Sequence, residues 1–176
     1  MRRLYYVGLV IAVVVLDQLT KWLIVSSMEL HEYRSLIDGL LSLSHVHNRG
    51  AAFGILSDAD LPHQAMLFSV LSLFALGAIA VYAFRLPAAA RLPQFALALI
   101  LGGAVGNLLD RMRLGYVVDF VHVYVKQHQW PDFNLADSAI TVGVALLILD
   151  ILRTPQPAPG RKAEMAEAAS PAGRTD

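Results

Sequence analysis

Four apolar stretches of membrane-spanning length constrain the fold of this chain more than any other feature. They run over residues 4–25, 65–84, 92–109 and 136–152, and about 20 such residues are enough to cross a hydrocarbon core as a helix. No water is available there, so a spanning segment must satisfy its backbone hydrogen bonds internally. Composition agrees: 56% of the residues are hydrophobic and 16% charged, where soluble domains have about 45–50% and 25%. The sequence predicts a polytopic all-α membrane protein with four transmembrane helices.

The first stretch follows Met1-Arg2-Arg3 and has the basic start and apolar core of a signal peptide. No small-residue cleavage site follows it, and residues 17–22 continue the helical pattern, which favours an uncleaved first span. Four spans place both termini on one side of the membrane. Basic residues at the predicted inner ends favour cytoplasmic termini by the positive-inside rule: Arg2, Arg3, Arg85, Arg91, Arg153, Arg161, Lys162 and Arg174. Fewer lie on the other side: Arg34, Arg49, Arg111, Arg113 and Lys126.

The two predicted external segments, residues 26–64 and 111–135, are more than connectors. Residues 41–47 alternate in polarity, and residues 116–125 are dense in β-branched and aromatic side chains, so both are predicted to form strands. We expect a small extracytoplasmic β-sheet on the outer membrane face.

These segments predict the domain organisation. We expect residues 1–153 to form one four-helix membrane domain. The remainder, 154–176, begins with a proline-rich run and ends in an Ala/Glu-rich stretch, which is typical of a disordered tail, and we expect this tail to be cytoplasmic.

Several functional classes lose support from the residues present. The absence of cysteine excludes disulfides, thiolate metal sites and a cysteine nucleophile, and the net charge of zero gives no indication of nucleic acid. His31-Glu32 has Ser35 where a zinc-protease helix needs its second histidine. His45 and His47 can share a strand face, which leaves a metal site open beside ordinary polar histidines. No Gly-x-Ser stretch exists for an elbow-type serine nucleophile.

Polar groups within or beside membrane spans cost free energy, so each is expected to have a hydrogen-bonding or charged partner or a functional role. Asp17 and Lys21 lie four residues apart on the first predicted helix, which permits an ion pair. Asn107, Asp110 and Arg111 share a face at the outer end of the third. Charge pairing and snorkelling at an interface explain each group equally well.

Asp119 and Asp137 are the candidate catalytic carboxylates. Asp119 lies between apolar residues on a predicted strand, where a solvent-facing carboxylate is the alternative. Asp137 lies three residues after Asn134, a good N-cap, so helix capping is its alternative. The segment with Asp119 leaves the outer end of the third helix and returns to the outer end of the fourth, so the carboxylates can approach one another. Such a pair shares a proton near neutral pH and can activate water.

The chain resembles the lipoprotein signal peptidase (signal peptidase II) family in five segments that occur in the family's order. They are Asp17-Gln18-Leu19-Thr20-Lys21, Asn48-Arg49-Gly50-Ala51-Ala52-Phe53-Gly54, residues 102–111 (GGAVGNLLDR), Val117-Val118-Asp119-Phe120, and Phe133-Asn134-Leu135-Ala136-Asp137-Ser138-Ala139. The segments extend from the first span to the fourth, and the unmatched part follows Arg153.

The resemblance implies an aspartyl endopeptidase that removes signal peptides from diacylglyceryl-modified bacterial prolipoproteins, on the amino side of the lipidated cysteine. It implies an inner-membrane enzyme with its site near the periplasmic face, without metal or cofactor and with no oligomer required. Asp119 and Asp137 would be the catalytic dyad. The resemblance also implies supporting residues: Asn107, Arg111 and Asn134 would hold the site and the substrate in place, with support from Asp110. The helix bundle would be buttressed by Asp17 and Lys21. The external β-sheet segment that receives the substrate would include Asn48 and Gly50.

Three other readings remain at this point. A Ser-Lys dyad would need Lys21 free, whereas Asp17 is placed to hold it. A small transporter could use a charge relay of Asp17, Lys21, Asp110 and Asp137, but it would need charges through the membrane depth, and residues 65–84 contain none. A non-enzymatic scaffold leaves the paired polar residues at one end unexplained.

Overall fold

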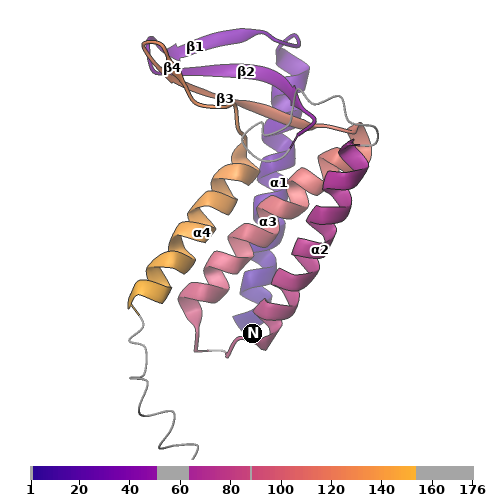
Figure 1. Ribbon diagram of the computed structural model, residues 1–176, viewed down its shortest axis with the longest axis vertical. Helices are drawn as coiled ribbons and strands as arrows, with labels where there is room; N and C mark the ends of the chain where they lie inside the picture. Colours follow the sequence, from indigo (N-terminus) through magenta and orange to yellow (C-terminus); the bar gives the residue numbers. More distant parts are fainter. Residues whose placement is uncertain (1, 51–63, 88, 154–176) are drawn as a thin grey trace, which may run out of the picture.

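The chain forms a bundle of four helices with a small sheet across one end (Figure 1). The computed structural model describes residues 2–50, 64–87 and 89–153. The helices are α1 (Arg2–Ser27), α2 (Gln64–Arg85), α3 (Arg91–Leu114) and α4 (Leu135–Arg153). Each is long and apolar enough to span a membrane, which confirms the four predicted spans. The predicted tail, 154–176, lies outside the described residues, as do Ala51–Gly54.

Helix α3 continues five residues beyond its predicted end at residue 109. The prediction stopped where the apolar run meets Asp110 and Arg111, but both side chains have partners within the protein and so the helix can continue. Its end is set instead by Gly115, whose left-handed backbone (φ 79°) lets its N–H donate to Arg111 O at 3.1 Å. This C-terminal cap strongly favours glycine.

Helix α3 occupies the centre of the bundle and packs against the other three helices. Its glycines permit a close approach between helices. A Cβ atom on Gly102 would lie 2.7 Å from Val13 Cβ of α1, and one on Gly103 would overlap Ala136 O of α4. Because small residues let membrane helices approach closely, α3 holds α1 and the start of α4 together.

The sheet is antiparallel and has the strand order β1-β2-β3-β4. Its strands are β1 (Tyr33–Ile37), β2 (Leu41–Asn48), β3 (Val117–Val125) and β4 (His128–Gln129). The predictions of β2 and β3 are confirmed. Strands β1 and β4 were not predicted, because every residue of β1 is exposed and gives no polarity alternation, while β4 has only two residues.

A bulge interrupts the pairing of β2 with β3. Leu43 lies opposite Val121 and Val46 opposite Asp119, so two residues of β2 face one of β3. Such a bulge shifts by one residue which side chains of a strand share a face. Asn48, opposite Val117, therefore lies on the same face as Asp119.

The sheet is joined to the bundle by a small apolar core. Ile24 and Met28, near the end of α1, pack with Val118 and Phe120 of β3. Burying each side chain contributes roughly 1.5–3 kcal/mol, and the contact fixes β3 over the helix ends.

Candidate active site

Asp119 is buried in the first half of β3, with 2% of its surface exposed. Its Oδ2 accepts a hydrogen bond from Asn48 Nδ2 at 2.9 Å, and its Oδ1 accepts one from Asn134 Nδ2 at 2.7 Å. The alternative of a solvent-facing carboxylate is therefore wrong. The strand is covered on both faces here, where the sheet meets the helix ends.

Asp137 lies in the first turn of α4 and is also buried. Its Oδ2 accepts the backbone N–H of Asn134 at 3.3 Å, while Asn134 Oδ1 accepts the backbone N–H of Asp137 at 3.0 Å. This reciprocal pair is a capping box, so the capping alternative is confirmed. The other oxygen, Oδ1, accepts from Asn107 Nδ2 at 2.8 Å. Capping thus occupies one carboxylate oxygen and leaves the second directed at α3.

Asn134 connects the two carboxylates. It is fully buried, and its Nδ2 group contacts both Asp119 Oδ1 and Asn107 Oδ1, at 2.7 and 3.1 Å. Its backbone N–H and side-chain oxygen hold Asp137. The chain between α3 and α4 therefore returns so that the carboxylates of β3 and α4 share one asparagine.

The electrostatics of the site bring the pKa of Asp119 close to neutral pH. Burial, together with the nearby charge of Asp137, raises the pKa of its carboxyl from 3.8 to about 7. Hydrogen bonds from Asn48 and Asn134 oppose this shift. A carboxyl that titrates near neutral pH can donate or accept a proton under ordinary conditions.

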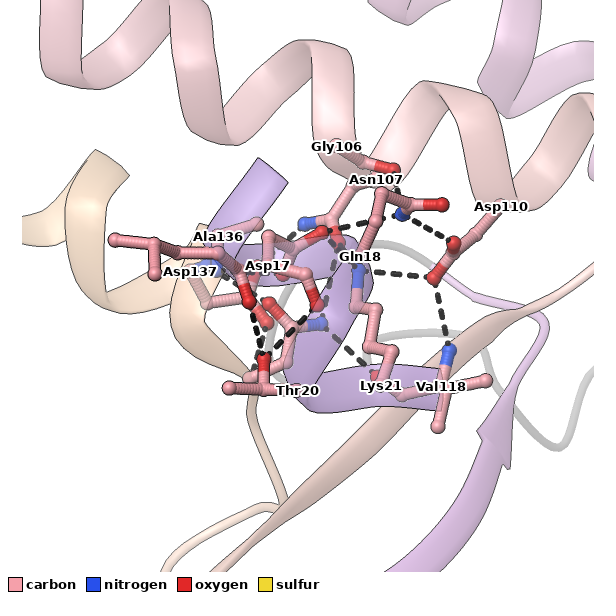
Figure 2. A network of polar contacts seen from close by, with 12 residues as sticks. Asp17, Gln18, Thr20, Lys21, Gly106, Asn107, Asp110, Val118, Ala136 and Asp137 are labelled. Carbon is pink, nitrogen blue, oxygen red and sulfur yellow. Dashed lines mark hydrogen bonds and ion pairs between the residues drawn. The ribbon is translucent and has the colours of Figure 1, made fainter. Parts of the chain in front are cut away.

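A buried charged network lies beside Asp137 (Figure 2). Lys21 Nζ contacts Asp17 Oδ2 at 2.9 Å, Asp110 Oδ2 at 2.8 Å and Asn107 Oδ1 at 2.9 Å, which uses all three of its donors. The predicted Asp17–Lys21 ion pair is confirmed. Lys21 is not free, which argues against a Ser-Lys dyad.

Gln18 is a network member that sequence reasoning missed. Its Nε2 donates to Asp110 Oδ1 at 2.8 Å and lies 3.3 Å from Gly106 O, so it links α1 to α3 (Figure 2). The available signal was its place between Asp17 and Lys21 in the first motif segment.

Arg111 extends the site towards the end of β2. Its Nη2 donates to Gly50 O at 2.9 Å, and Asn48 Oδ1 accepts the Gly50 N–H at 2.9 Å. Arg111 Nη1 lies 3.5 Å from Asn107 O, and its Cζ lies 6.0 Å from the Phe68 ring centroid. The structure thus brings all ten predicted site residues into one connected set.

The two histidines of β2 contact ordinary packing partners. His45 Nδ1 lies 3.0 Å from Met28 O, and the His47 ring stacks on Tyr116 with centroids 3.7 Å apart. Across residues 2–50, 64–87 and 89–153, no three His, Asp or Glu side chains gather as metal ligands. These contacts favour the polar-strand reading of the histidines over the metal site.

Comparison with known proteins identifies the family to which the chain belongs. The family model described as signal peptidase (SPase) II matches residues 9–153. The chain belongs to the signal peptidase II family. It is 50% identical to the lipoprotein signal peptidase of Geobacter sulfurreducens, over 83% of this chain and 90% of that protein. It is 43% identical to that of Geobacillus kaustophilus, over 89% and 99%. A solved bacterial membrane enzyme superposes with a TM-score of 0.76 at 30% identity, over 86% and 94%.

The buried polar network of this signal peptidase II chain joins α1, α3 and the start of α4 (Figure 2) to β3 of the sheet. A charge relay would need charges along the membrane depth, and residues 65–84 hold none. Together with the family match, this arrangement favours a peptidase site over a transporter pathway. A scaffold reading loses support for the same reason.

Proposed function

We propose that this protein removes signal peptides from diacylglyceryl-modified bacterial prolipoproteins by aspartyl peptide hydrolysis, cutting on the amino side of the lipidated cysteine. Family membership supports the reaction, since relatives about 40–50% identical are lipoprotein signal peptidases. One observation carries the chemistry: two buried carboxylates, Asp119 and Asp137, bind the same asparagine, Asn134. They form the proposed catalytic dyad.

The dyad holds one proton and positions one water. We assign the shared proton to Asp119, whose pKa is raised to about 7. We assign the negative charge to Asp137, which lies in the first turn of α4, where the positive end of the helix favours a carboxylate. Asp137 takes a proton from water, the hydroxyl adds to the scissile carbonyl carbon, and Asp119 gives its proton to the carbonyl oxygen. When this intermediate collapses, one of its hydroxyl groups returns a proton to Asp119, the C–N bond breaks, and Asp137 gives its proton to the leaving amine.

The products follow directly from that step. The signal peptide gains a carboxylate, and the lipidated cysteine gains a free amine. No metal is needed in this scheme, because the carboxylates themselves handle the proton transfers. All the residues in it come from one chain, so no oligomer is required.

The amide side chains orient the dyad. Asn48 and Asn134 bind the two oxygens of Asp119, and Asn107 binds Asp137. Arg111 supports the substrate near Gly50. Its Nε is buried and has no hydrogen-bond partner within the described part of the chain.

The proposed location is the bacterial inner membrane, with cytoplasmic termini and the sheet on the periplasmic side. The start of α1 and the end of α4 both lie at the end of the bundle away from the sheet (Figure 1). A lipid-anchored cysteine holds its scissile bond at the membrane surface, the depth proposed for the dyad. The apolar signal helix enters sideways from the lipid.

Cleavage should depend on the substrate's lipid. An unmodified prolipoprotein should have a kcat/KM lower by about 100-fold, because nothing then holds the bond at the depth of the dyad. The measurement compares purified enzyme on one prolipoprotein with and without diacylglycerol. Equal rates would contradict the proposed placement of the scissile bond.

Cleavage should also fall as pH rises through about 7, because Asp119 must be protonated to act as the acid. Asn48→Ala removes a hydrogen bond that favours the ionised form of Asp119. The pKa of Asp119 should then rise, and the alkaline limb of the kcat profile should move to higher pH. An unchanged or lower limb in this variant would argue against Asp119 as the acid.

A further inference from the structure

Asp17 makes a contact that its ion pair with Lys21 does not explain. While its Oδ2 faces Lys21, its Oδ1 accepts the backbone N–H of Ala136 at 3.0 Å. Ala136 is the second residue of α4, and Asp17 lies 119 positions earlier, on α1. A side chain of one helix thus binds the first turn of another (Figure 2).

This contact supplies a cap that the local sequence cannot provide. The first N–H groups of a helix have no partner within it. Asn134 Oδ1 is already used by the N–H of Asp137, so the N–H of Ala136 needs another acceptor. A carboxylate there also complements the positive end of the helix.

Gly106 makes room for that carboxylate. A Cβ atom on this residue would lie 2.5 Å from Asp17 Oδ2 and 3.1 Å from Asp17 Cγ. It would also lie 3.5 Å from Ala136 Cβ. Asp17 therefore reaches α4 across a gap that only a glycine of α3 leaves open.

We propose that Asp17 is a positioning residue that caps α4 from α1 and so fixes Asp137 against Asp119. This inference rests on the proposed function, because it assigns Asp137 to the chemistry. The resemblance implied only a general support role for Asp17. The cap is specific: it acts on the residue next to Asp137, and displacement of a reacting group by about 1 Å can cost roughly 100-fold in rate.

The test uses two variants and a matched control. Asp17→Ala removes the cap directly. Gly106→Ala leaves every charge in place but pushes Asp17 away from Ala136. Gly102→Ala is the control, because its Cβ would clash with Val13 Cβ at 2.7 Å, also between α3 and α1, without touching Asp17.

Three quantities are measured on the full chain in detergent with lipidated prolipoprotein: kcat per folded enzyme, KM, and amide hydrogen exchange in residues 134–138. Asp17→Ala and Gly106→Ala should lower kcat by roughly 100-fold, leave KM within about twofold, and speed exchange in the first turn of α4 several-fold. Gly102→Ala should lower only the folded fraction.

The inference is overturned if Gly106→Ala behaves like Gly102→Ala, or if first-turn exchange is unchanged in Asp17→Ala. Wild type and Asp137→Asn are run in the same assay. Failure of wild type to cleave, or full activity of Asp137→Asn, would count against the proposed function instead. The exchange measurement reports the cap independently of either result.

Discussion

Replacing Asp119 or Asp137 by asparagine should reduce kcat on a diacylglyceryl prolipoprotein by roughly 10⁴-fold or more, the scale typical of removing one member of a catalytic unit. Asparagine has nearly the shape of aspartate but cannot exchange a proton near neutral pH, so the dyad would lose either its acid or its base. Both variants should insert and fold. Activity is measured as conversion of the lipidated precursor by purified enzyme.

Asp38→Asn provides the matched control. Asp38 lies in the exposed turn between β1 and β2, where its Oδ1 accepts the Ser35 hydroxyl. The same chemical change there should leave kcat within about twofold, as for most surface substitutions. Full activity in either dyad variant would remove that aspartate from the mechanism.

Replacing Lys21 by methionine should lower the free energy of unfolding by about 3–5 kcal/mol, the usual cost of removing one partner from a buried ion pair. Methionine is an unbranched side chain one atom shorter than lysine, and it leaves Asp17 and Asp110 facing one another without a cation. The side chains of both aspartates are at least 96% buried, as is that of Lys21, so water cannot replace the ammonium group. Denaturant unfolding in detergent measures the loss.

Two variants test the cause of that loss. Lys126→Met makes the same change in the exposed turn after β3 and should shift stability by less than about 0.5 kcal/mol. Adding Asp110→Asn to Lys21→Met should recover part of the stability, because one buried charge is then removed. A double variant less stable than Lys21→Met would mean that charge balance is not what Lys21 supplies.

The membrane helices were predictable because bilayer thickness imposes a length on any apolar run that crosses it. The end of α3 was not, since the predicted span stopped at residue 109, where the apolar run ends, and the helix continues to Leu114. Asp110 has its partners, Lys21 and Gln18, about 90 positions earlier. A charge can stay in a buried helix when a distant segment supplies its partner, and apolar patterning contains no information about that partner.

The candidate site was likewise predictable from the sequence only in part. Asp137 was read as either a cap or a catalytic group, because spacing to Asn134 supports both roles equally. The structure shows that capping uses one oxygen and leaves the other for Asn107, so the two roles are compatible. The cap from Asp17 to Ala136 joins residues 119 positions apart, and local spacing cannot reveal it.

The bulge in β2 determines which side chains of that strand lie next to Asp119. If pairing continued without it from Leu43, His45 would lie opposite Asp119, and His47 would take the place of Asn48. Imidazoles gain and lose charge close to neutral pH. Protonation of these histidines at lower pH would therefore change the electrostatic potential at the Asp119 carboxyl group. With the extra residue, the side chains in these two positions are those of Val46 and Asn48, neither of which titrates. The one extra residue in β2 therefore keeps the imidazoles of His45 and His47 out of the positions next to the carboxyl group that holds the dyad's proton.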